Sequence, residues 1–252
     1  MKALLLVSYD GTAFSGWQRQ PNARTVQEEM EEAAYRAFSR RVTLTASGRT
    51  DAGVHALGQV VEGDFPEGIP PEKLRECLNI QLPPDVKVLR SCKAPEAFDV
   101  TRQAKRKTYC YNAYFAETEL PLYSRYAARL KRQPDIALMR EAAKLLEGEH
   151  DFSAFRASGY TSRTSIRTLY SVNTEKTAIP SGTLYSVRVT GNGFLYNMVR
   201  ILAGELFAVG CGKQEGITRA FETGERSALS VTMPPHGLVL VSADYGITEL
   251  LP

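Results

Sequence analysis

Hydrophobic and polar positions along the first hundred residues alternate between two spacings. Short runs rich in aliphatic and β-branched residues predict strands, whereas apolar residues repeated every three or four positions predict helices. Thr25 and Glu28 form a capping box that opens one helix, and Pro70 and Pro71 open a second. This order predicts helices packed on one face of a mostly antiparallel sheet, an α+β arrangement. The predicted strands are residues 4–8, 42–46, 54–64 and 86–89.

The second half of the chain repeats this mixture of elements. Asp135 caps a predicted helix that Gly148 ends, and another helix is predicted from Gly191-Asn192-Gly193 to Leu206. The inward residues of the first of these helices are expected to be Leu138, Met139, Ala142, Leu145 and Leu146. Strands are predicted around 109–111 and at 167–173, 184–190 and 239–242, with a short surface helix at 214–223. We therefore expect two α+β subdomains, residues 1–104 and 105–252.

Composition indicates a soluble globular protein. Of 252 residues, 43% are hydrophobic and 23% are charged, which argues against disorder. The net charge of +3 excludes a histone-like electrostatic binder but allows a local basic cleft for RNA. No apolar run approaches the length of a membrane span, and the apolar start is too short for a signal peptide. We expect a cytoplasmic protein with no membrane partner.

Cysteine and histidine spacing argues against a metal site. The four cysteines form no C-x-x-C pair, and the three histidines are scattered singly. We therefore expect reduced thiols and no structural zinc. The chain also has no phosphate-binding loop and no dinucleotide fingerprint.

Residues 47–56, Ser-Gly-Arg-Thr-Asp-Ala-Gly-Val-His-Ala, concentrate turn-forming and charged residues. Gly48 and Gly53 allow a sharp turn or the close approach of another molecule. A carboxylate on such a turn can be held still while it faces a cleft, and Arg49 is near enough to keep Asp51 ionised. The alternative, from spacing alone, is a polar turn between two strands with an ordinary surface ion pair.

Two further groups of residues have both a functional and a structural interpretation. Tyr109 and Tyr111 lie on one face of a predicted strand beside Arg106 and Lys107, and RNA binding uses such cations and flat rings. The alternative is a strand whose rings fill the core. Arg200 has no carboxylate one turn away on its own helix, so it requires an anion from elsewhere or extends its guanidinium to water.

The amino-acid sequences of these stretches resemble the motifs of the TruA family of tRNA pseudouridine synthases. The strongest match is Gly-Arg-Thr-Asp-Ala-Gly-Val-His-Ala, and the others follow in family order across nearly the whole chain. The resemblance implies two pseudo-symmetric subdomains with a catalytic cleft between them. It also implies a homodimer that binds the anticodon arm and elbow of tRNA and modifies uridines 38, 39 and 40. The other matching stretches are residues 9–18, 93–104, 109–111, 150–155, 194–200 and 233–238.

The resemblance assigns roles to individual residues. Asp51 corresponds to the catalytic carboxylate, Arg200 to the arginine that lies against it, and Tyr109 to the ring that packs on the target uracil. Arg49 would supply further positive charge at Asp51. Thr108 and Cys110 depart from the family because they are uncharged, and Tyr196-Asn197 stands where some members carry His. The substrate-binding residues are expected to be Tyr109, Gly48, Thr50, Phe194, Lys107 and Arg106.

The implied reaction breaks the bond between C1′ and N1, turns the uracil over and joins C5 to C1′. It is a redox-neutral isomerisation for which no cofactor is expected, in agreement with the missing cofactor motifs. One carboxylate can serve it, either by attacking the sugar or by taking a proton from C2′. Trp17, the only tryptophan, is expected to plug the core beneath its loop. Two alternatives stay open: a non-catalytic tRNA-binding or RNA-folding module that uses the same basic cleft, and a nucleoside hydrolase.

Overall fold

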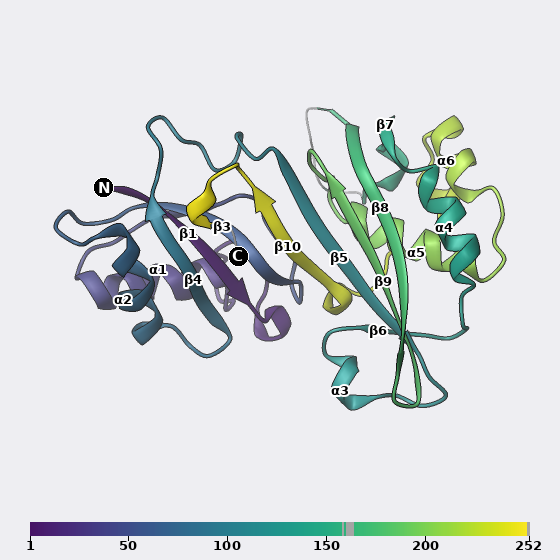
Figure 1. Cartoon of the computed structure of the whole chain (residues 1–252), viewed down its shortest axis with the longest axis horizontal. Helices are drawn as coiled ribbons and strands as arrows, with labels where there is room; N and C mark the ends of the chain where they lie inside the picture. Colours follow the sequence, from purple (N-terminus) through teal and green to yellow (C-terminus); the bar gives the residue numbers. More distant parts are fainter. Residues whose placement is uncertain (158, 160–163, 251–252) are drawn as a thin grey trace. The chain divides into compact units, whose positions relative to one another are not determined.

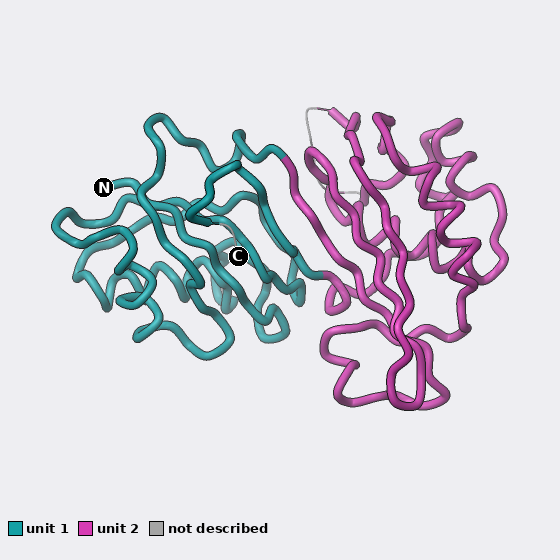
Figure 2. Tube along the Cα trace, viewed as in Figure 1, with its two compact units in different colours: residues 1–105, 239–252 teal, residues 106–238 magenta. Residues whose placement is uncertain are grey.

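The computed structural model describes residues 1–157, 159 and 164–250. The chain forms two compact units, shown in two colours in Figure 2. The first comprises Met1–Lys105 together with Val239–Pro252, and the second comprises Arg106–Leu238. The division predicted from the sequence, 1–104 and 105–252, differs from this one because the segment that begins at Val239 belongs to the first unit. It belongs there because β10 (Leu238–Asp244) pairs with a strand of that unit.

The first unit is built on a mostly antiparallel sheet. Strand β1 (Lys2–Tyr9) lies between β4 (Val86–Lys93) and β3 (His55–Asp64) and runs antiparallel to both. Strand β2 (Leu44–Ala46) also pairs antiparallel with β3, whereas β10 pairs parallel with it, with Val239 opposite His55. Strand β3 therefore pairs with three strands, β1, β2 and β10, and is central to this sheet.

Helices α1 (Val26–Phe38) and α2 (Leu74–Gln81) pack on each other, and α2 also contacts β4 (Figure 1). The side chain of Asn79 in α2 acts as a bonding partner for β4, because its Nδ2 donates to Val88 O over 2.7 Å and its Oδ1 accepts from Val88 N over 2.8 Å. Side-chain bonds of this kind satisfy backbone groups at a sheet edge that would otherwise be open to another chain.

Residues after β4 and after β10 cover one face of this sheet. Leu4 and Leu6, which point to the same face of β1, pack in one buried cluster with Phe98, Tyr245 and Leu250. The Tyr245 hydroxyl donates to Val100 O within this cluster. The two chain segments that flank the second unit in sequence are thus anchored in the core of the first.

The second unit contains a long antiparallel ladder. Strand β5 (Arg106–Phe115) pairs with β9 (Gly182–Gly191), and β9 pairs with β8 (Ile166–Ile179). Strand β7 (Gly148–Asp151) extends the ladder beyond β8, and β6 (Ala128–Leu130) pairs parallel with β5. The mostly antiparallel α+β class expected from the sequence is confirmed in both units.

Helix α5 (Met198–Gly210) packs on the ladder through Phe207, whose ring contacts those of Tyr111 and Tyr185 at centroid distances of 6.3 and 6.5 Å. Helices α4 (Ile136–Lys144) and α6 (Gly216–Thr223) both contact α5 (Figure 1). The remaining helical segments are α3 (Pro121–Ser124) and 3₁₀ turns at Gly11–Ala13, Pro71–Lys73, Ser153–Phe155, Arg226–Ala228, Pro235–Gly237 and Thr248–Leu250.

Several local predictions are confirmed and others are wrong. Thr25 and Asp135 cap their helices, with their side-chain oxygens accepting from the Glu28 and Ala137 amides over 3.4 and 2.7 Å. Helix α5 begins at Met198 instead of the predicted Gly191-Asn192-Gly193, because Asn197 has a φ of 59° and left-handed backbone cannot continue a helix. Leu138 and Leu145 are 46% and 53% exposed, so their predicted inward orientation is wrong.

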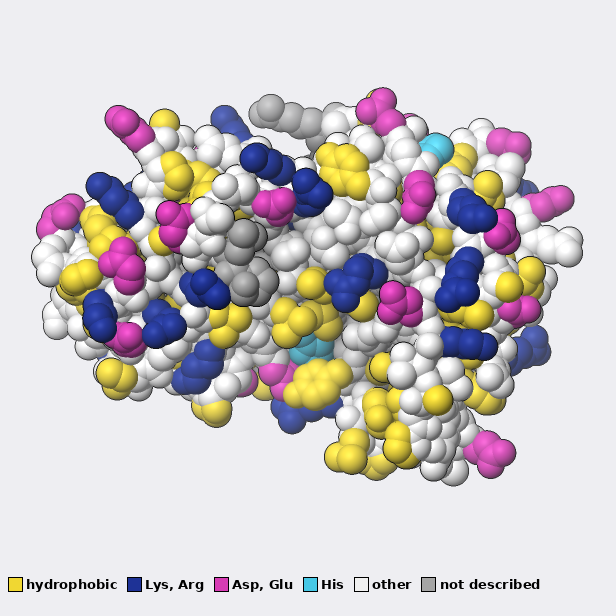
Figure 3. Space-filling model, in the orientation of Figure 1, with side chains coloured by type: hydrophobic (Ala, Val, Ile, Leu, Met, Phe, Trp, Pro, Cys, Tyr) yellow, Lys and Arg dark blue, Asp and Glu magenta, His cyan; other side chains and the backbone are white. Residues whose placement is uncertain are grey.

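Within the part of the chain that the structure describes, no helix combines the length and the apolarity needed to cross a membrane. On the face shown in Figure 3, basic and acidic side chains are interspersed, which agrees with the small net charge.

Replacing Asn79 with Ala removes both side-chain bonds to Val88. We expect the free energy of unfolding to fall by about 1–3 kcal/mol, because partly buried polar groups of the strand lose their partners. Urea denaturation followed by circular dichroism measures the change. The exposed Asn173→Ala on β8 is the control, expected within about 0.5 kcal/mol of the parent, and an equal loss in both variants would contradict the role of Asn79.

Candidate active site

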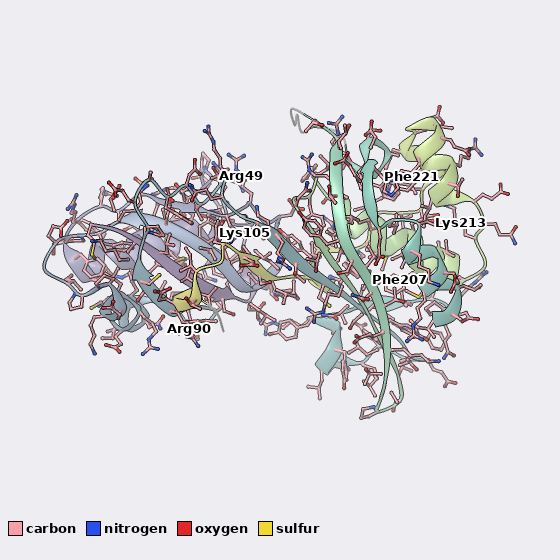
Figure 4. All side chains as sticks on the ribbon, turned by 45° about the horizontal axis from the view of Figure 1, so that its top comes forward. Arg49, Arg90, Lys105, Phe207, Lys213 and Phe221 are labelled. Atoms are coloured by element: carbon pink, nitrogen blue, oxygen red, sulfur yellow. The ribbon has the colours of Figure 1, made fainter. Side chains whose placement is uncertain are left out.

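The predicted catalytic stretch forms an irregular loop between two strands. This Asp51 loop, residues 47–54, follows β2 and leads directly into β3. Gly53, with a φ of 78°, reverses the chain just after Asp51. Asp51 is half-buried and Arg49 is exposed on the surface of the first unit (Figure 4). The predicted pairing of Arg49 with Asp51 stays a prediction.

Backbone hydrogen bonds fix the Asp51 loop to the loop that follows β1, residues 10–17, which we call the first loop. Trp17 N donates to Thr50 O over 3.0 Å, and Gly53 N donates to Phe14 O over 3.2 Å. These bonds bracket Asp51 on both sides along the chain. The residue is therefore held by its immediate neighbours, although it lies in no helix or strand.

The composition of the first loop permits this close contact. Gly16 has a φ of 93°, and a Cβ at this position would lie 2.7 Å from Thr50 O, so only glycine fits. Gly11 N donates to His55 Nδ1 over 3.0 Å, which fixes the start of the loop to the first residue of β3. Trp17 is 3% exposed, which confirms that it plugs the core beneath the loop.

A buried polar network lies beneath the Asp51 loop. The hydroxyls of Tyr9 and Thr50 are 2.7 Å apart. Gln59, which is fully buried in β3, donates through Nε2 to Gly48 O over 2.8 Å and accepts through Oε1 from Ser47 Oγ over 2.5 Å. Burial raises the pKa of Tyr9 to about 12, despite its hydrogen bonds to Thr50 and Gln59, so the phenol stays protonated.

The residues predicted to contact the target base lie in the second unit. Tyr109 in β5 is 9% exposed, and its ring meets that of Phe194 edge-on at a centroid distance of 5.1 Å. Tyr111, two positions further along the same face, is fully buried in the core. Tyr111 therefore fills the core, which is the structural alternative considered for both rings. Tyr109 instead lies beside Phe194, which is also one of the predicted substrate-binding residues.

The basic residues at the start of β5 differ in their surroundings. Arg106 is exposed, and Lys107 is half-buried. Burial lowers the pKa of Lys107 because desolvation penalises its charged form. A lysine in such a place gains from an anionic ligand more than an exposed lysine does.

Arg200, in the first turn of α5, is half-buried and bound to neighbouring groups of its own unit. Its Nε donates to Met233 O over 2.7 Å and its Nη1 donates to Asn197 Oδ1 over 2.6 Å. Two of its donor groups therefore fix the direction of the guanidinium. Its approach to Asp51, which lies in the other unit, stays a prediction.

His236 lies close enough to Arg200 to be affected by its charge. Burial lowers the pKa of His236, and the Arg200 guanidinium lowers it further. The neutral ring is therefore the favoured form beside the arginine. Among the described residues, no group of three or more His, Cys, Asp or Glu side chains is placed to hold a metal ion.

The residues that hold the site together carry no signal of this role in the sequence motifs. Tyr9 and Gln59 have ordinary strand positions, and Met233 takes part through its carbonyl, which no side-chain pattern reveals. A polar residue such as Gln59 inside an apolar strand run is the one available signal, because buried polar groups require partners.

Comparison with known proteins identifies close relatives. A model of the family described as tRNA pseudouridine synthase matches residues 5–101 and 142–246. The tRNA pseudouridine synthase A of Geobacter sp. (strain M21) is 42% identical over 244 residues, 96% of this chain and 97% of that protein. The protein of the same name from Thermoanaerobacter sp. (strain X514) is 38% identical over 96% of this chain and 98% of its own length.

Among solved structures, a Cbf5-Nop10-Gar1 complex is similar at 11% identity and a TM-score of 0.32, covering 82% of this chain and 53% of that one.

Replacing Tyr9 with Phe removes the hydroxyl that bonds to Thr50 while preserving the ring. We expect the free energy of unfolding to fall by about 1–3 kcal/mol, because the buried Thr50 hydroxyl loses a partner. Chemical denaturation measures it, with Tyr35→Phe as the matched control on a ring that is 45% exposed. If both variants lose the same stability, the network beneath the loop does not contribute as described.

His236 should make stability depend on pH. Its pKa is lower in the folded protein than the value of about 6.5 in an unfolded chain. Its contribution is therefore fully present above that value and is lost as the pH falls towards the folded pKa. Urea titrations from pH 8 to pH 5 should show the parent losing more stability than His236→Asn as the pH falls. A difference between the two that does not change with pH would contradict this linkage.

Proposed function

The chain belongs to the tRNA pseudouridine synthase family, and on this premise we propose that it modifies uridines 38, 39 and 40 of the tRNA anticodon arm with Asp51 as the catalytic carboxylate. Membership makes it an isomerase that acts on tRNA. The observation that carries the assignment to Asp51 is the pair of backbone bonds that bracket this residue and fix its loop to the first loop.

The reaction needs one carboxylate in its charged form. The bond between N1 and C1′ breaks, the uracil turns over, and C5 forms the new bond to C1′ while its proton moves to N1. An ionised Asp51 serves both routes open to a single acid, attack on C1′ or removal of the C2′ proton, because each uses the electron pair of the carboxylate. Fixing that carboxylate in advance removes the cost of ordering it during the reaction.

Arg200 and Arg49 are the groups proposed to keep Asp51 ionised. A cation within hydrogen-bond reach favours the charged form of a carboxylate in a desolvated site. Two hydrogen bonds, to Met233 O and to Asn197 Oδ1, support this role for Arg200, because they hold its guanidinium in one orientation within its own unit. Arg49 lies two residues from Asp51 on the same loop and is exposed, as a residue facing an anionic substrate would be.

Tyr109 is proposed to stack on the target uracil, supported by the aromatic pair that it forms with Phe194. Extracting a base from its stack costs on the order of a few kcal/mol. Stacking on an aromatic side chain returns about 1–3 kcal/mol per base. Phe194 contributes by holding the Tyr109 ring edge-on, so that one face of the ring can receive the base.

Further substrate-binding groups are proposed in each unit, namely Gly48 and Thr50 on the Asp51 loop and Arg106 and Lys107 at the start of β5. The two cations suit the phosphates that flank the flipped nucleotide. Lys107 is favoured as a phosphate ligand because an anion would offset the desolvation that lowers its pKa. We further propose a homodimer in which both subunits contact the elbow and the anticodon arm of one tRNA.

Replacing Asp51 with Asn preserves the size of the side chain and removes its charge. We expect turnover to fall by more than ~10²-fold, because neither route proceeds without the carboxylate electron pair. Release of tritium from tRNA labelled at uracil C5 measures turnover, and filter binding should give a tRNA Kd close to that of the parent.

Asp64→Asn, at an exposed position of β3, is the matched control and should have parental turnover. Appreciable tritium release by a folded Asp51→Asn protein would remove Asp51 from the mechanism. Mapping of the modified uridines in tRNA exposed to the parent tests the choice of positions 38, 39 and 40.

A further inference from the structure

Glu205 is a buried carboxylate in the middle of α5 that the proposed reaction does not use. It is fully buried, among otherwise apolar neighbours on its helix. Its Oε2 accepts from Lys213 Nζ over 2.8 Å and from Ser230 N over 2.7 Å. Burying a charge in this way is costly unless the charge has partners, so the arrangement requires an explanation.

Glu205 and Lys213 together bind the chain that follows the 3₁₀ turn at Arg226–Ala228. Lys213, labelled in Figure 4, also donates to Ala228 O over 2.9 Å and to Ser230 Oγ over 3.1 Å. All three of its ammonium protons thus have acceptors. The carboxylate and the ammonium group therefore fix the first part of residues 229–234, which we call the 229–234 segment.

The 229–234 segment lies directly on α5 at Gly204, the residue before Glu205. A Cβ on Gly204 would lie 2.2 Å from Val231 O, so only glycine allows this approach of backbone to helix. Further along, Met233 N donates to Arg200 O over 3.3 Å. The segment has no helix or strand of its own, and its bonds to α5 determine its position.

The far end of the 229–234 segment holds the side chain of Arg200. Met233 O accepts from Arg200 Nε over 2.7 Å, and Tyr111 donates through its hydroxyl to Pro234 O over 2.8 Å. A continuous path of contacts therefore runs from Glu205 through Ser230 and Met233 to the guanidinium.

The second carboxylate oxygen of Glu205 lies against the start of α6. A Cβ on Gly216, the first residue of that helix, would be 1.9 Å from Oε1. A negative charge at this position is stabilised by the helix dipole. Glu205 therefore packs against the first residue of α6, although its Oε1 accepts no hydrogen bond from the described residues.

We infer that Glu205, together with Lys213, is a positioning residue that fixes the 229–234 segment so that Met233 O holds Arg200 in its working orientation. This inference rests on the proposed catalytic role of Arg200. It assigns to the buried ion pair an effect on turnover, because a displacement of about 1 Å in a group that acts on the reacting atoms can cost up to ~10²-fold in rate.

The test is a double-mutant cycle on turnover. Glu205→Gln retains the volume and removes the charge, and Arg200→Met removes the guanidinium. We expect Glu205→Gln to lower kcat by about 10-fold while KM for tRNA stays within about twofold. In the Arg200→Met background, Glu205→Gln should lower kcat no further, because its effect passes through Arg200.

A second variant keeps the test open if Glu205→Gln folds poorly. Glu205→Met combined with Lys213→Met replaces the whole ion pair with apolar side chains, which buried sites tolerate better than the loss of one partner. Its kcat should fall to the level expected for Glu205→Gln. The control is Glu141→Met with Lys144→Met, which removes an exposed pair of 2.8 Å from α4 and should have parental kcat.

Two outcomes separate this inference from the proposed function. If Arg200→Met has the turnover of the parent, the catalytic role proposed for Arg200 fails. If Arg200→Met is impaired but the folded Glu205 variants have parental kcat, or lower kcat by the same factor in both backgrounds, Glu205 does not act through Arg200 and the positioning role is overturned.

Discussion

The irregular backbone around Asp51 depends on hydrogen bonds from another irregular segment. Backbone N–H and C=O groups removed from water need hydrogen-bond partners, and a loop has no regular pattern of backbone bonds that supplies them. The Asp51 loop finds them in the first loop, through Trp17 N and Phe14 O. Because Gly16 and Gly11 let the two loops touch, one short stretch near the N-terminus determines where the carboxylate lies.

The two units use different kinds of side chains to hold the irregular segments next to their candidate site residues. In the first, a neutral network of hydroxyl and amide groups, centred on Gln59, supports the Asp51 loop. In the second, charged groups are used, and the 229–234 segment is bound to α5 by Glu205 and Lys213. The two acceptors of Arg200, Met233 O and Asn197 Oδ1, are themselves neutral, and the ion pair acts on the backbone that presents Met233 O.

Much of the fold was predictable because local signals decided it. The capping residues Thr25 and Asp135 act as predicted, and the strand order of the first unit follows the apolar runs. The start of α5 was not predictable, because it depends on a left-handed residue, Asn197, whose side chain bonds to Arg200. The inward orientation predicted for Leu138 and Leu145 was also wrong, because neighbours distant in sequence determine which side of α4 is covered. The candidate residues were found by motif, but the groups that hold them, such as Gln59 and Met233 O, were found only from the structure.

The parallel pairing of β10 with β3 has a consequence for how the chain matures in the cell. The second unit is inserted between Lys105 and Val239 of the first, so the two segments of the first unit are separated in sequence by the whole second unit. Residues 1–105 emerge from the ribosome before the second unit, whereas β10, which pairs with their sheet, emerges after it. While the second unit is being synthesised, the nascent first unit therefore exposes the edge of β3 where β10 will later bind, and this unit is completed only after the second unit has been translated.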